Sequence, residues 1–98
     1  MNNYHKQIQG MIDERGIDST DDILRENLSS VTKKVISSRE RIEKLKNTIE
    51  NTLNQDEINH LQYDIQDNQE RLNIFLQELK EADEIYGAFN EYIKRKKP

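Results

Sequence analysis

Apolar residues recur along this chain with the seven-residue period of a coiled coil. They alternate steps of three and four residues over 24–49 and again over 58–93, except for one step of seven in each series, where Ser38 and Asn68 occupy the stripe. The two series are Leu24, Leu28, Val31, Val35, Ile42, Leu45 and Ile49, and then Ile58, Leu61, Ile65, Leu72, Phe75, Leu79, Ala82, Tyr86, Phe89 and Ile93. Because an α-helix turns once every 3.6 residues, each series forms one stripe along a helix. The pattern predicts two long helices, each with a single apolar stripe.

The two series are out of phase, since the step from Ile49 to Ile58 is nine residues rather than seven. The residues between them, 51–56, are rich in turn formers. We therefore predict an all-α fold: a long antiparallel helical hairpin, or coiled coil, with a short N-terminal helix packing at its open end. A parallel assembly, in which this break only interrupts one long helix, remains the alternative.

The whole chain, 1–98, is expected to be a single helical domain. We predict a short helix over 3–15, long helices over 18–52 and 55–94, and a basic tail over 95–98. Gly16 is a plausible helix stop, Asp18 or Ser19 is expected to cap the second helix, and Asn54 or Asp56 the third. The fold-back brings Ser38 close to Asn68, either as a polar contact that fixes the register or as two tolerated weak spots.

Charge is unevenly distributed along the sequence. Residues 1–54 carry nine basic and nine acidic side chains, residues 55–93 carry two and ten, and residues 94–98 add four basic ones, giving a net charge of −4. The second predicted helix has a basic cluster over 33–46. The hairpin would set this cluster beside acidic residues of the third helix, namely Asp64, Asp67, Glu70 and Glu78. Opposite charges at these places favour the antiparallel pairing.

The sequence gives little support for catalysis, metals or cofactors. Glu57 and His60 have the spacing found in di-metal helical bundles, but such bundles need two such motifs and further carboxylates. No nucleophile has an identifiable base partner, the glycines form no phosphate loop, and there is no cysteine. We expect no enzyme activity, no metal and no cofactor. Without an apolar run long enough for a membrane span or a signal peptide, a cytoplasmic location is also expected.

Three large apolar residues, Ile36, Ile74 and Leu76, lie off the predicted stripes. Ile36 and Ile74 should lie at the same level of the hairpin, where they either mark a second contact surface or are scattered surface isoleucines. Only 33% of the residues are hydrophobic, and an isolated two-helix hairpin buries little apolar surface. We therefore predict self-association through these three residues, as a homodimer resembling a four-helix bundle.

The C-terminal end combines aromatic and basic residues. Tyr86, Phe89 and Tyr92 are followed by Lys94, Arg95, Lys96 and Lys97. We expect the short first helix to dock at this end, and we assign these seven residues to the binding of a protein partner of unknown identity. The basic tail could instead bind nucleic acid, or simply match the helix dipole.

The function predicted from these features is a non-catalytic protein-interaction module: a small adaptor, assembly factor or inhibitor, of a kind that phages and mobile elements encode. Two alternatives remain. One is a nucleic-acid-associated protein that uses the basic tail. The other is an acidic mimic of nucleic acid that uses the net charge of −8 over residues 55–93.

Overall fold

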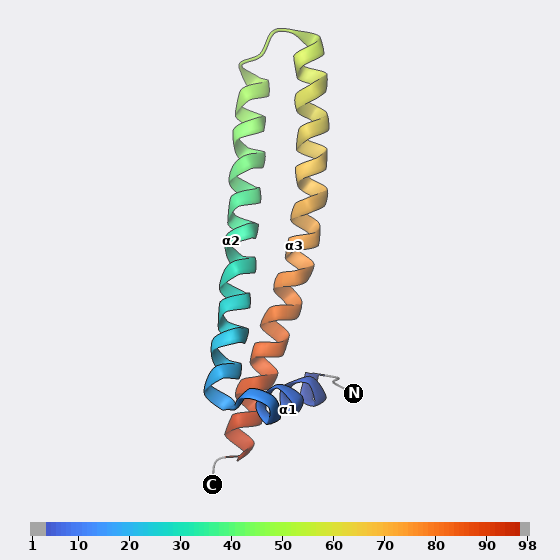
Figure 1. Ribbon diagram of the computed structural model, residues 1–98. Helices are drawn as coiled ribbons and strands as arrows, with labels where there is room; N and C mark the ends of the chain where they lie inside the picture. Colours follow the sequence, from blue (N-terminus) through green and yellow to red (C-terminus); the bar gives the residue numbers. More distant parts are fainter. Residues whose placement is uncertain (1–3, 97–98) are drawn as a thin grey trace.

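The chain folds into an extended hairpin of two long helices with a short helix across its open end (Figure 1). The computed structural model describes residues 4–96, in which α1 spans Tyr4–Arg15, α2 spans Ile17–Glu50 and α3 spans Gln55–Lys96. The described residues measure 66 × 24 × 20 Å, close to the roughly 63 Å expected for a helix of the length of α3. The all-helical hairpin is thereby confirmed, whereas coiled-coil winding and dimerisation stay predictions.

Gly16 joins α1 to α2 with no intervening loop. Its N–H donates to the Ile12 carbonyl at 2.8 Å, and its own carbonyl accepts from the backbone N–H of Thr20 at 3.1 Å and from Thr20 Oγ1 at 2.7 Å. Its backbone angles, φ 86° and ψ 169°, fall in a region open essentially to glycine alone. The prediction that Asp18 or Ser19 caps α2 is wrong, because this glycine lets the helix begin at Ile17 with no side-chain cap.

The turn between α2 and α3 follows the sequence prediction more closely. Asn54 Oδ1 accepts hydrogen bonds from the backbone N–H groups of Asp56 at 2.9 Å and Glu57 at 3.2 Å. This is the geometry of a helix N-cap, and it satisfies two of the donors that a helix start leaves open. Of the two predicted caps, Asn54 is the one used.

Burial is concentrated at the open end of the hairpin. There Ile8, Leu24, Ala88 and Phe89 form a cluster of buried side chains, of which Ile8 and Phe89 are fully covered. Along the rest of the hairpin several apolar residues of α2 are still buried. In α3, however, no residue between 55 and 81 is buried. Its stripe residues over this stretch are only half-buried. Two helices alone therefore leave most of the α3 stripe partly open to water.

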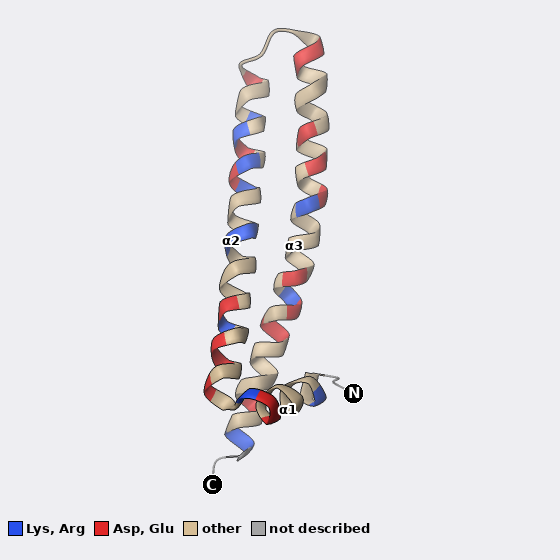
Figure 2. Ribbon diagram, in the orientation of Figure 1, with Lys and Arg blue, Asp and Glu red and all other residues tan. Residues whose placement is uncertain are grey.

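The expected ion pairs between α2 and α3 do not form. The ion pairs among residues 4–96 all lie within one helix: Arg15 with Glu14, Arg25 with Asp21, and Arg71 with Asp67. Figure 2 shows most of the basic residues of α2 in the half nearer the turn, where α3 carries acidic residues as well. Direct ion pairs between the two long helices are therefore absent among residues 4–96, and the support of flanking charge for the antiparallel pairing stays a prediction.

Ser38 and Asn68 line the same groove between α2 and α3. Asn68 Nδ2, however, donates to the Asp64 carbonyl of its own helix at 2.7 Å, and no hydrogen bond joins the two side chains. Of the two interpretations, this arrangement favours tolerated weak spots over a contact that fixes the register.

Replacing Gly16 by alanine should lower the free energy of unfolding by about 1–3 kcal/mol, because a Cβ strains the backbone at this φ and ψ. Gly10→Ala is the matched control. Gly10 lies inside α1 with no atom within 4 Å of the added Cβ, so the same change should stabilise by about 0.5–1 kcal/mol. Urea unfolding followed by circular dichroism measures both, and equal effects of the two substitutions would contradict the proposed role of Gly16.

Candidate functional site

The open end is a packed three-helix cluster. Ile8 of α1 and Phe89 of α3 are both 0% exposed, and the Phe89 ring stacks on Tyr86 with centroids 6.2 Å apart. Half-buried apolar residues surround this pair: Tyr4, Met11, Ile12, Ile85, Tyr86, Tyr92 and Ile93. The short α1 is thus fixed by the side chains that it covers, as expected for a helix too short to be stable alone.

Tyrosine hydroxyls tie the three helices of this cluster together. Tyr86 donates to Asp21 Oδ1 of α2 at 2.9 Å and accepts from the Arg25 guanidinium at 3.3 Å. Tyr92 donates to Gln9 of α1, and Tyr4 donates to Glu84 at 3.2 Å. Partial burial and the Glu84 carboxylate raise the pKa of the Tyr4 phenol. Each helix is therefore joined to another by a polar contact as well as by apolar packing.

This arrangement bears on the partner-binding residues expected from the sequence. Phe89 lies in the core and has no surface to offer while α1 is docked. Tyr86 and Tyr92 present only part of their rings and use their hydroxyls inside the chain. Lys94 and Arg95 are exposed at the end of α3. The side chain of Lys96, and Lys97 altogether, lie outside the described residues.

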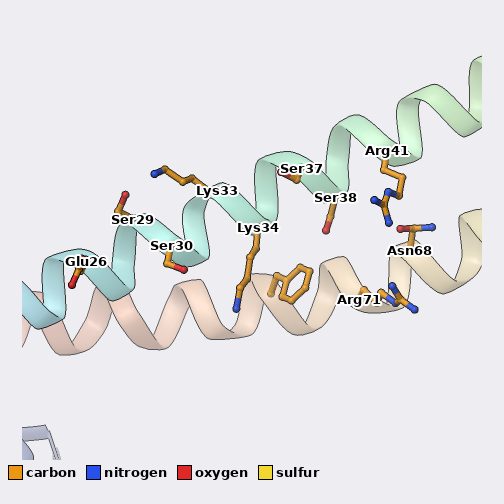
Figure 3. Close-up of a pocket in the computed structure, with 11 residues that line it drawn as sticks. Glu26, Ser29, Ser30, Lys33, Lys34, Ser37, Ser38, Arg41, Asn68 and Arg71 are labelled. Atoms are coloured by element: carbon orange, nitrogen blue, oxygen red, sulfur yellow. The ribbon is translucent and has the colours of Figure 1, made fainter.

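A groove along one side of the hairpin collects basic and serine side chains from both long helices (Figure 3). We call it the basic groove. It has a volume of about 630 Å³ and is lined by Glu26, Ser29, Ser30, Lys33, Lys34, Ser37, Ser38, Arg41, Asn68, Arg71 and Phe75. Four of these residues are cationic and one is anionic, although the whole chain has a net charge of −4. The groove is therefore a local reversal of the charge of the protein.

The cations of the basic groove have few partners within the chain. Arg71 pairs with Asp67 at 3.1 Å, whereas Lys33, Lys34 and Arg41 take part in none of the ion pairs found among the described residues. Lys34 Nζ instead lies 5.7 Å from the centroid of the Phe75 ring, a cation–π distance. In Figure 3 Lys34 extends from α2 across α3, and Arg41 points toward Asn68.

The sequence contains a periodic pattern of polar residues for this groove, separate from its apolar stripes. Ser30, Lys34, Ser37 and Arg41 follow one another by steps of four, three and four residues. This is the heptad spacing again, carried by polar residues on a second stripe of α2. A stripe with this period keeps a constant direction toward a neighbouring helix along its whole length.

The opposite side of the hairpin is apolar. There Leu28 and Thr32 of α2 meet Leu76 and Leu79 of α3, with Lys80 and Asp83 at the margin. We call Leu28, Thr32, Leu76 and Leu79 the apolar edge. Its three leucines and Thr32 are half-buried, so the apolar edge remains accessible to solvent. The hairpin thus has two long sides of different chemistry.

Comparisons of the chain with protein-family models, with curated proteins and with solved structures gave no match. Across residues 4–96, no group of three or more histidine, cysteine, aspartate or glutamate side chains is placed to hold a metal ion. Glu57 and His60 are both exposed beside the turn. None of the helices of the described part is long and apolar enough to cross a membrane. The geometry of the two sides therefore carries the functional argument.

The three residues expected to mediate self-association are distributed over both sides. Leu76 lines the apolar edge, and Ile36, which is 50% exposed, comes one helical turn after Thr32 and so extends that edge. Ile74 is 59% exposed, but it lies three residues after Arg71, beyond the wall of the basic groove. Ile36 and Ile74 therefore lie on different sides of the hairpin and do not form a single surface. A role for Ile74 in self-association stays a prediction.

Phe89→Ala should lower the free energy of unfolding by about 3–5 kcal/mol, and Ile8→Ala by about 2–5 kcal/mol, because both remove fully covered side chains from the three-helix cluster. Leu61→Ala, a half-buried residue of the same stripe near the turn, should cost only about 1–2 kcal/mol. Urea unfolding gives all three values. A Phe89→Ala variant as stable as the parent would mean that this residue belongs to an interface rather than to the core.

Proposed function

We propose that this protein is a non-catalytic interaction module that pairs with a second copy of itself through the apolar edge. The observation that carries the proposal is the incomplete burial of α3, in which no residue between 55 and 81 is buried. A stripe of leucine, isoleucine and phenylalanine left half-open over this length is the usual mark of a helix that packs against more than one neighbour.

A second copy fits the apolar edge better than an unrelated surface does. In a two-fold dimer the same patch meets itself, so each rim charge needs an opposite charge on the same patch. Lys80 and Asp83 supply one of each sign at the margin of the edge. Two hairpins joined in this way form a four-helix bundle.

The non-catalytic part of the proposal rests on the shape of the two sides. Both surfaces with distinct chemistry run as open stripes along helices, which suits helix-to-helix docking. Sites for chemistry are instead concave and largely enclosed, so that they exclude water from the reacting groups. An adaptor, assembly factor or inhibitor that presents a helical face to its partner is the class of function that this geometry supports best.

Ile36→Glu and Leu76→Glu should each convert the dimer into a folded monomer. Each substitution removes about 1.5–3 kcal/mol of apolar burial per copy, acts twice in a symmetric dimer, and sets a carboxylate where a partner would exclude water. Multi-angle light scattering over a range of concentrations measures the mass, and circular dichroism verifies that the helices remain.

Ile74→Glu is the matched control, because it introduces the same charge at an equally exposed isoleucine on the other side of the hairpin. It should leave the dimer intact. A monomeric parent protein would refute the self-pairing proposal, and a dimer broken by Ile74→Glu but not by Ile36→Glu would move the interface to the opposite side.

A further inference from the structure

We propose that the basic groove docks an acidic helix of a partner protein, with carboxylates of that helix meeting Lys34 and Arg41. This inference rests on the proposed function as an interaction module and names the chemistry of the partner. It concerns the side of the hairpin away from the apolar edge, so the two surfaces can be tested separately.

The first argument is charge. The chain holds 19 acidic residues against 15 basic ones, so carboxylates that could pair with its cations are numerous. Lys33, Lys34 and Arg41 nevertheless gather along one groove, and none of the three takes part in the ion pairs found within residues 4–96. Grouping like charges costs energy by mutual repulsion, and an anionic partner relieves that cost.

The second argument is spacing. Lys34 and Arg41 are seven residues apart on α2, as are Ser30 and Ser37 on the same stripe. Seven residues of helix rise about 10.5 Å, which equals the distance between residues seven apart on a neighbouring helix. A partner helix with acidic residues at that interval can therefore meet both cations at once. The serines are small enough to let its backbone come close.

The third argument is preorganisation. The Lys34 ammonium already lies over the Phe75 ring, 5.7 Å from its centroid, so part of the entropy of fixing this long side chain has been lost before binding. Phe75 is half-buried in the groove and offers an apolar contact beside Lys34. An amphipathic helix lying in a groove uses this combination of apolar anchor and flanking charge.

A nucleic acid fits the groove less well. Toward the open end the groove continues into a cleft lined by Glu78 and Glu81. Asp67 forms an ion pair with Arg71, which lines the groove. A strand with a phosphate every few ångströms would run onto these carboxylates. A protein helix can instead be acidic over the few turns that face the cations and of another charge elsewhere.

The test uses fluorescence anisotropy with the full chain and a labelled synthetic helical peptide of about three heptads. The peptide carries glutamates seven residues apart beside a leucine, and a second peptide has glutamine in their place. The acidic peptide should bind, and binding should weaken as ionic strength rises from about 0.05 to about 0.5 M. The double substitution Lys34→Gln with Arg41→Gln should lower its affinity about tenfold.

Arg39→Gln with Lys46→Gln is the matched control. These residues are also seven apart on α2, but they follow Thr32 by seven and fourteen residues and so belong to the side of the apolar edge. This variant removes the same net charge and should change the affinity less than about twofold. Equal losses in the two double variants would overturn the inference, because only total charge would then matter.

Two further outcomes also overturn it. The first is an absence of binding by the acidic peptide at low salt. The second is tighter binding of single-stranded DNA than of the peptide, with the same dependence on Lys34 and Arg41. Light scattering on the same samples separates this inference from the proposed function, since an intact dimer without peptide binding refutes the groove alone. Peptide binding by a chain that does not dimerise refutes the self-pairing alone.

Discussion

Two helices packed side by side can cover only one flank of each other's apolar stripe, and most of this structure follows from that constraint. Where α1 adds a third helix, side chains such as Ile8 and Phe89 lose all contact with water. Beyond α1 the hairpin continues for many turns with the α3 stripe half-open. Stability is therefore expected to be greatest at the open end and to decrease toward the turn near Asn54.

The fold could be derived from the sequence because it depends on periodicity and on one strong local signal. The heptads predict the long helices, their change of phase predicts the reversal, and Asn54 marks the start of α3 through its short side-chain acceptor. Gly16 was recognised only as a stop. Its second role, starting α2 at once, depends on a backbone conformation that no pattern of side chains records.

The surfaces were harder to derive, because they depend on how the helices are rotated rather than on where they lie in the sequence. Level along the hairpin follows from counting residues, and Ser38 and Asn68, which this count places close together, line one groove. The side of the hairpin on which a residue lies is harder to derive. Two residues on different helices can share a level and still face in opposite directions. Ile36 and Ile74 illustrate this. The basic cluster of α2 was expected to lie beside acidic residues of α3, but Lys34 and Arg41 line a groove to which α3 contributes no carboxylate.

The separation of the two sides has a consequence for how the module would act. A dimer formed on the apolar edges turns both basic grooves outward, on opposite faces of the four-helix bundle. Two acidic helices on one partner, or on neighbouring copies of a partner, could then be held together. Because the second contact is intramolecular once the first has formed, weak and salt-sensitive docking at each groove is strengthened by effective concentration without any new contact. A groove with only a few exposed cations would bind more tightly in such a pair, so dimerisation at the apolar edge would strengthen binding at the opposite side without being required for it.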